Sequence, residues 1–243
     1  QSLEFSGSIM PMTTQGNISK VVEKLFAVGA HLGFSKSRRH AAVKPFVLST
    51  KNGTDIINLE KTEVQLDKAL EYMKELGKGK KTVLFVGTKP EIRTIVEAGA
   101  NKISMPFVVN RWVGGMFTNF TQMKKRLEKK DDWTAKKTSG ELEKYTKKER
   151  LLIDDEVKKL EGLFGGMQGM TKVPDAIVVV DPRAESIAVT EASMMGIPVV
   201  ALLNTDCDMK GITYPIVGND AARESVTLFV NDIASAYEEG AKL

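Results

Sequence analysis

The sequence predicts an α/β fold: a Rossmann-like, doubly wound, mainly parallel sheet with a protruding, coiled-coil-like α-helical hairpin inserted into it. Three observations lead to this prediction. Continuous apolar runs of strand length are typical of parallel strands that are covered on both faces. Segments with helical periodicity alternate with these runs. Between about residues 120 and 163, strand signals are absent and charged residues of both signs dominate.

Short apolar segments predict the strands. In chain order they are residues 45–48, 56–59, 82–87, 107–109, 176–180, 198–203 and 214–217. The first two flank Asn52-Gly53, and Asn-Gly between apolar runs is a strong hairpin signal. The last contains Pro215, which cannot donate to a sheet ladder and therefore predicts an edge strand.

Amphipathic periodicity predicts the helices of the core. In chain order they cover residues 18–28, 64–76, a stretch through 88–96, 185–195 and a last stretch through 219–237. Thr88 and Glu91 have capping-box spacing, and Asn219 or Asp220 is expected to cap the last helix. Gly77 is expected to close the second helix.

Residues 120–163 are expected to form the inserted hairpin. Apolar positions recur at spacings of four, three and four residues along its second helix, with a shorter matching seam along the first. These positions are Ile153, Val157, Leu160 and Phe164, and in the first helix Phe120, Met123 and Leu127. Asn119 is expected to cap the first helix, and the segment from Trp133 to Lys147 to supply the tip. Because the apolar stripe is thin, the hairpin should project into solvent or onto a partner.

This organisation divides the chain into three parts. Residues 18–119 and 164–243 form the core, and residues 120–163 form the hairpin. Residues 1–17 are interpreted as an N-terminal extension, either flexible or left by processing or expression. No secretory signal is expected, and no apolar run approaches the roughly 18 residues of a membrane-spanning helix. The single cysteine, Cys207, fits a reducing cytoplasm and is interpreted as a small buried residue.

Positive charge is mild overall but clustered along the chain. The net charge is +4, and such a value favours nucleic-acid binding only where the charge gathers. The clusters are Lys36, Arg38, Arg39, His40 and Lys44; Lys124, Lys125, Arg126, Lys129 and Lys130 to Lys136 and Lys137; and Lys144, Lys147, Lys148 and Arg150. Each cluster taken singly could equally be a solvated helix face.

The signals of nucleotide enzymes are missing. A dinucleotide fingerprint needs three glycines, whereas residues 87–90 and 181–183, which follow two of the buried strands, contain only Gly87. No P-loop occurs, and Gly165-Gly166 is better interpreted as a helix stop. Asp181 and Asp206 stand where α/β enzymes keep catalytic groups, but helix capping and turn formation explain both at least as well.

Metal and nucleophile signals are also weak. The imidazole and thiol groups of His31, His40 and Cys207 are too few for a structural zinc site. His31 is more simply a packed, hydrogen-bonded histidine. We therefore expect no enzyme, no cofactor, no metal and no small-molecule substrate.

A series of short blocks carries a family resemblance. They are Gly29 to Gly33, Lys44 to Phe46, Ile56 to Thr62, Leu84 to Lys89, Arg111 to Asn119, Lys147 to Glu149, Gly165 to Met167, Pro174-Asp175, Gly196 to Pro198 and Gly218 to Asp220. In this order they resemble the bacterial-type family of the second protein of the small ribosomal subunit, over nearly the whole chain. The chain departs from the family pattern at Phe34, at Arg39-His40-Ala41, at Val109 and at Cys207-Asp208-Met209.

The resemblance implies a structural constituent of the small ribosomal subunit that binds ribosomal RNA and supports subunit assembly and translation. It also implies that neighbouring small-subunit proteins, including the first one, dock nearby in a bacterial, rather than organellar, cytoplasm. Lys and Arg gain by replacing counterions on crowded phosphates, and arginine adds forked hydrogen bonds. The expected RNA contacts are Lys36, Arg38, Arg39, His40, Lys44, Arg111, Lys124, Lys125, Lys129, Lys147, Lys148 and Arg150.

Several alternatives remain open on sequence grounds. Trp112 either stacks on a base or ribose beside a phosphate-bound Arg111, or packs between hairpin and core with Arg111 ion-paired next to it. A nucleotide-dependent enzyme would need the glycine-rich loop that the chain lacks. A purely protein-binding adaptor would use the hairpin and bind its partner without RNA, even at high salt.

Overall fold

Five parallel strands form the central sheet of the protein. The computed structural model describes residues 19–243, so the expected extension over 1–17 and Ile18 lie outside the described residues. The strands are β4 (Val83–Val86), β5 (Phe107–Val108), β6 (Ala176–Val180), β7 (Val199–Leu203) and β8 (Tyr214–Val217). Their spatial order is β5-β4-β6-β7-β8, and every neighbouring pair is parallel. The Rossmann-like α/β prediction is confirmed, and β8 is an edge strand as Pro215 predicted.

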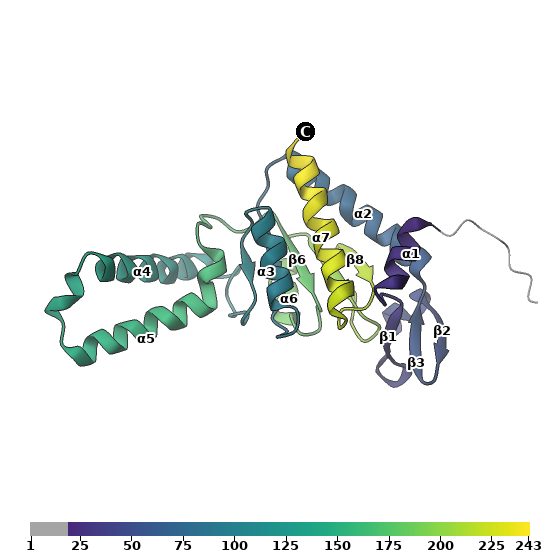
Figure 1. Ribbon diagram of the computed structural model, residues 1–243, viewed down its shortest axis with the longest axis horizontal. Helices are drawn as coiled ribbons and strands as arrows, with labels where there is room; N and C mark the ends of the chain where they lie inside the picture. Colours follow the sequence, from purple (N-terminus) through teal and green to yellow (C-terminus); the bar gives the residue numbers. More distant parts are fainter. Residues whose placement is uncertain (1–18) are drawn as a thin grey trace, which may run out of the picture.

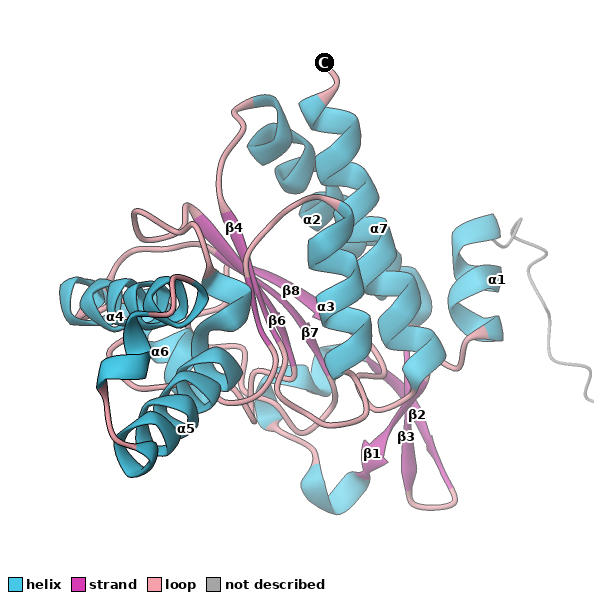
Figure 2. Cartoon of the chain, turned by 60° about the vertical axis from the view of Figure 1, so that its left-hand side comes forward, coloured by secondary structure: helices cyan, strands magenta, loops and turns pink. Residues whose placement is uncertain are grey.

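Helices cover both faces of this sheet, which explains the continuous apolar runs (Figure 2). Helices α2 (Leu59–Lys78), α3 (Arg93–Lys102) and α7 (Arg223–Ala241) pack on one face. Helix α6 (Ser186–Met194) and the segment that leads into the hairpin pack on the other. Side chains therefore alternate between two apolar layers that are both buried, with Val178 in one layer and Val179 in the other.

Helices α2 and α7 approach each other closely because glycines stand at their contact. A Cβ atom at Gly240 would lie 2.1 Å from the carbonyl oxygen of Lys74, and one at Gly77 would lie 2.2 Å from that of Tyr237. No other residue type fits either position without a shift of the backbone. Gly77 lies inside α2, which ends at Lys78, one residue later than predicted.

A small antiparallel sheet precedes the central one. Helix α1 (Lys20–Ala27) leads to β1 (Leu32–Ser35), β2 (Val47–Lys51) and β3 (Thr54–Ile57), in the spatial order β1-β3-β2. The hairpin at Asn52-Gly53 is confirmed. Both residues have positive φ values, 51° and 77°, as a two-residue type I′ turn requires. Pro45 and Phe46, expected in a strand, instead end a 3₁₀ segment, and β1 was not predicted.

Two long helices follow β5 and extend away from the core (Figure 1). They are α4 (Phe120–Thr138) and α5 (Lys147–Phe164). The expected tip was too long: α4 continues past Trp133 to Thr138, and a capping box between Thr146 and Glu149 begins α5. Met123, Leu127, Leu160 and Phe164 of the expected seam are buried. Coiled-coil packing between α4 and α5, and the division into core and hairpin domains, stay predictions.

Three predicted helix starts are wrong in detail. Thr88 and Glu91 form no capping box, since Thr88 donates to Glu185 and α3 begins only at Arg93. The Asn219 side chain accepts from Ala221 and Ala222, before α7 begins. Asn119 precedes α4, but its side chain makes no capping hydrogen bond. Among residues 19–243, no helix combines the length and apolar character needed to cross a bilayer.

Candidate nucleic-acid interface

The predicted RNA contacts lie in two groups at opposite ends of the molecule. Residues 36–44 connect β1 to β2 beside the small sheet, and the hairpin residues lie on α4 and α5. The central sheet and its helices separate these two ends (Figure 1). Arg111 lies between them, in the segment that joins β5 to α4. We call residues 36–44 the first loop.

Two lysines of the first loop are exposed. Lys36 and Lys44 form no ion pair within residues 19–243. The loop backbone is tied down around them, because Lys36 N donates to Gly53 O at 2.8 Å and His40 N donates to Thr205 O at 2.8 Å. The two ammonium groups are thus held on an ordered loop and are available to an anion.

The two arginines of the first loop have partners inside the protein. Arg38 pairs with Asp206 at 2.9 Å, and its guanidinium lies 4.3 Å from the centre of the Phe34 ring. Arg39 makes a forked contact with the buried carboxylate of Asp55, and its Nη2 also donates to Thr50. The hydrogen bond from Arg39 holds the pKa of Asp55 below its ordinary value. Both arginines therefore help to fix the loop, and their contact with RNA stays a prediction.

His40 also has a local structural role. Its Nδ1 accepts a hydrogen bond from Ala42 N at 3.3 Å and lies 3.9 Å from an Asp208 oxygen. Phe34 and Arg39, two of the departures from the family pattern, both make contacts within this region. Its basic residues divide into those that hold the loop and those that the loop presents.

The hairpin cations divide in the same way. Lys129 pairs with Glu156 of the facing helix at 2.7 Å, and Lys124 lies 3.9 Å from Glu128. The remaining predicted cations are exposed and form no ion pair in the described part of the chain: Lys125, Lys147, Lys148 and Arg150. A pair that the sequence did not reveal joins Lys130, which is buried, to Glu161 at 2.7 Å.

The segment around Arg111 decides between the two interpretations of Trp112. Trp112 is buried and its Nε1 donates to Glu191 at 3.2 Å, so packing between hairpin and core is confirmed. Arg111 is exposed and, among the described residues, forms no ion pair, so the expected ion pair beside Trp112 is wrong. Glu191 was missed, because nothing local in its helix marks a carboxylate that faces inward.

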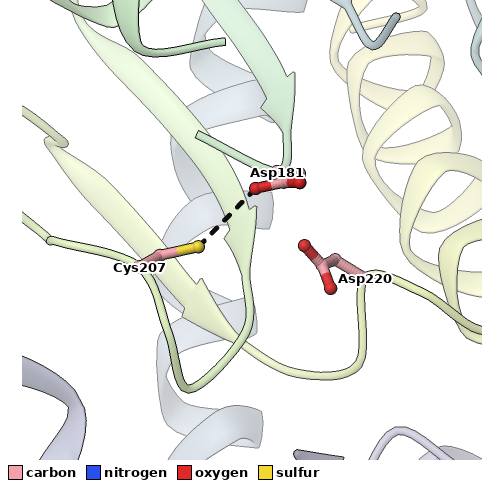
Figure 3. Close-up of side chains that lie close together, drawn as sticks. All are labelled: Asp181, Cys207 and Asp220. Atoms are coloured by element: carbon pink, nitrogen blue, oxygen red, sulfur yellow. Dashed lines mark hydrogen bonds between the residues drawn. The ribbon is translucent and has the colours of Figure 1, made fainter. Parts of the chain in front are cut away.

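Acidic residues gather at the carboxyl ends of the parallel strands. Oxygen and sulfur atoms of Asp181, Cys207 and Asp220 lie within 4.8 Å of one another (Figure 3). Lys89 supplies positive charge to this cluster, with its Nζ 2.5 Å from Asp181 and 3.3 Å from Asp220. Burial raises the pKa of the Cys207 thiol, which donates to Asp181. Asp181 also accepts from the backbone of Arg183, as the turn interpretation expected.

Two smaller expectations concern His31 and Cys207. His31 packs against the Phe26 ring with 4.3 Å between centroids. Its Nδ1 is buried without a hydrogen-bond partner, so the histidine is packed but the expected hydrogen bond is not made there. Burial lowers the pKa of His31. Cys207 is buried, as expected.

Comparisons with known proteins identify the family of this chain. A protein-family model, "Ribosomal protein S2", matches residues 25–240. A protein of Dictyoglomus thermophilum named small ribosomal subunit protein uS2 is 41% identical over 92% of this chain and 91% of its own length. Proteins with the same name from Nocardia farcinica and Mycolicibacterium paratuberculosis are 43% and 44% identical over 90% of this chain, covering 77% and 79% of their own lengths. With a family match from residue 25 to residue 240, the chain belongs to the ribosomal protein S2 family.

Proposed function

We propose that this chain is a structural constituent of the small ribosomal subunit, that it works in the bacterial cytoplasm, and that it binds ribosomal RNA through the first loop and the hairpin. The observation that carries the proposal is the similarity, over nine-tenths of the chain, to proteins named small ribosomal subunit protein uS2. The exposed cations on ordered supports add a physical reason. Ammonium and guanidinium groups that have no partner in the protein gain most from phosphates, where they displace condensed counterions.

The arrangement favours recognition of RNA shape over base sequence. Folded RNA offers backbone phosphates and 2′-hydroxyls on several helices at once. A basic loop at one end of the core and a basic hairpin at the other can bind two such helices (Figure 1). In this view Lys36, Lys44 and Arg111 contact phosphates directly, whereas Arg39 mainly holds the loop in shape.

The proposal contains no catalytic step. The carboxyl ends of the parallel strands are where open α/β sheets bind their ligands. Here the ammonium group of Lys89 occupies that position and is paired with the carboxylates of both Asp181 and Asp220. A structural role for the chain is consistent with this arrangement.

The experiment is reassembly onto small subunits depleted of their S2-family protein. The wild-type chain is compared, across a salt series, with a variant that carries Lys36→Ala and Lys44→Ala. We expect binding that weakens with salt, and a slope of log K against log salt that is lower by about 2 in the variant, about 1 for each lost phosphate contact.

A matched control removes two lysines from elsewhere on the surface. Lys68 and Lys78 are exposed on α2, so Lys68→Ala with Lys78→Ala lowers the net charge equally. Equal slopes in both variants would mean that net charge, and not the first loop, sets the affinity. Failure of the folded wild-type chain to join depleted subunits at any salt would contradict the proposal itself.

A second function, the docking of neighbouring small-subunit proteins such as the first one, is favoured by two leucines. Leu151 and Leu152 lie on the hairpin with 61% and 60% of their surface exposed. Exposed apolar surface often marks protein contacts, and these two leucines give α5 such surface. If this surface binds a protein, Leu151→Ser with Leu152→Ser should lower its incorporation in the reassembly, while RNA binding of the purified chain stays unchanged.

A further inference from the structure

One buried carboxylate organises the segment that leads into the hairpin. Glu191 lies on α6 and accepts five hydrogen bonds from residues more than seventy positions earlier in the chain. Its Oε1 accepts from Trp112 Nε1 at 3.2 Å and from Gly115 N at 2.7 Å. Its Oε2 accepts from Phe117 N at 3.0 Å, and from both the backbone N and the Oγ1 of Thr118 at 3.2 Å.

Such a carboxylate is strongly held in its charged form. Burial raises the pKa of Glu191, but the hydrogen bonds from the backbone N–H groups outweigh burial and hold its pKa below the ordinary value. Hydrogen bonds from several backbone N–H groups replace the water that a buried carboxylate has lost. Hydrogen bonds to a charged group are also stronger than bonds between neutral groups.

The segment held by Glu191 is the root of the hairpin. Thr118 precedes the first residue of α4, Phe120, by two positions. The return of the hairpin is also seated on this side of the core. Asn110 Nδ2 donates to Gly162 O at 2.6 Å, and Gly166 packs so closely that a Cβ there would lie 2.4 Å from Phe107 O. Both ends of the hairpin are therefore tied to the sheet.

We propose that Glu191 is a positioning residue: by clamping residues 112–118 onto α6, it sets the direction of the hairpin relative to the core and presents Arg111 outward between them. Glu191 itself touches no RNA in this scheme. The consequence for RNA binding rests on the proposed function, whereas the consequence for hairpin direction does not.

The substitution Glu191→Gln tests the clamp with almost no change in volume. Glutamine keeps one acceptor oxygen but turns an NH₂ group toward N–H donors, so one side of the clamp is lost whichever way the amide lies. The backbone groups that lose their partner are part-buried or buried. Leaving such donors unsatisfied costs more than the bond itself gains in stability.

The first measurement is the distance between hairpin and core by pulsed electron paramagnetic resonance. Spin labels are attached at Ser139→Cys, at the end of α4, and Lys78→Cys, on α2, both exposed positions. Native Cys207 stays in place, because it is buried and its pKa is raised, which leaves its thiol unreactive. We expect one narrow distance distribution for the wild-type sequence and a broader one for Glu191→Gln.

The second measurement is the affinity for depleted small subunits. Glu191→Gln should bind roughly tenfold more weakly, because a loosely held hairpin must be ordered on binding. The neutralisation Glu224→Gln, at an exposed position at the start of α7, is the charge-matched control and should leave both measurements unchanged. Thr118→Val removes one donor with little change in shape and should give an intermediate broadening, even if Glu191→Gln does not fold.

The outcomes separate the two proposals. Unchanged distance distributions in folded Glu191→Gln and Thr118→Val variants would overturn the positioning role, whether or not these variants bind depleted subunits more weakly. Broader distributions with wild-type binding absent would leave the positioning role standing and remove the proposed function. Broader distributions with unchanged affinity would show that hairpin direction does not govern RNA binding.

Discussion

At the scale of single residues, the buried charged pairs of this protein matter more for the stability of the fold than the exposed ones. Lys89 joins Asp181 to Asp220 at the carboxyl edge of the sheet, and Arg39 joins Asp55 to the first loop. Removing one partner of such a pair leaves an uncompensated buried charge, which costs about 3–5 kcal/mol. Exposed pairs such as Lys124 with Glu128 contribute about 1 kcal/mol or less.

The pH dependence of stability should report on Asp220. Burial raises its pKa from 3.8 to about 6. Because the folded pKa lies above the unfolded one, this group stabilises the native state fully below pH 3.8 and loses that contribution as pH rises through 6. The shift of about 2 units corresponds to about 3 kcal/mol.

Asp220→Asn cannot titrate and so isolates the effect. In urea unfolding from pH 4 to pH 7, the stability of wild type relative to Asp220→Asn should fall by about 2.5 kcal/mol. Asp67→Asn, an exposed carboxylate on α2, removes the same charge as a control. A difference between wild type and Asp220→Asn that does not vary with pH would contradict the assignment.

Sequence reasoning reached the residues whose surroundings are local and missed those whose partners are distant. The burial of Cys207 and the turn role of Asp181 follow from neighbouring residues. Glu191 and Asp55 were not singled out, because their partners come from other elements of the fold. The same reasoning placed Arg39 among free cations, since the sequence does not indicate that Asp55 is buried opposite to it.

At the scale of elements, the order of helices and strands was predictable and their ends were not. Apolar periodicity reports the buried face of a helix, so the sequence predicted α2 and α7. The first turns of helices depend on tertiary contacts. Thr88, for example, donates a hydrogen bond to Glu185 and does not cap α3. Strand β1 was missed because its residues are at most half-buried and show no apolar run.

The contact between α2 and α7 gives a test at this scale. At Gly240 a Cβ would lie 2.1 Å from the Lys74 carbonyl oxygen, so Gly240→Ala must push the helices apart. We expect a loss of about 1–3 kcal/mol in the free energy of unfolding, the usual cost of overpacking.

The hairpin supplies the control for this substitution. Gly162 lies inside α5, and a Cβ there would meet nothing within 4 Å. Gly162→Ala should therefore raise stability by about 0.5–1 kcal/mol, through helix propensity alone. If the two alanine variants had equal stability in the same denaturant titration, the close contact of α2 with α7 would not be a determinant of the fold.

At the scale of the whole molecule, both cationic ends are tied to the central core by hydrogen bonds. The first loop is tied to the core through Thr205 and Gly53, and the hairpin through Glu191 and Asn110. Charge clustering marked both ends, and apolar patterning predicted the sheet between them. Their separation depends on strand order, which sequence alone left open.

This separation predicts independent contributions to binding. The first-loop variant Lys36→Ala with Lys44→Ala and a hairpin variant with Lys147→Ala and Lys148→Ala should weaken subunit binding by factors that multiply in the combined variant. Distant sites without shared partners usually add in free energy. A combined loss far from the product, measured in the same salt, would mean that the two ends bind as one coupled unit.

The place of the hairpin in the chain also bears on the time course of synthesis. Strand β4 pairs directly with β6, although the two strands lie far apart in the chain. The hydrogen bond from Thr82 N to Asp175, at the start of the two strands, joins residues that are 93 positions apart. At about 5–20 residues per second, a translating ribosome needs on the order of 5–20 s to make this stretch. Throughout that interval the nascent chain holds an apolar strand whose edge toward β6 is unpaired. Chaperone capture should therefore concentrate in the window between the emergence of β4 and that of β6.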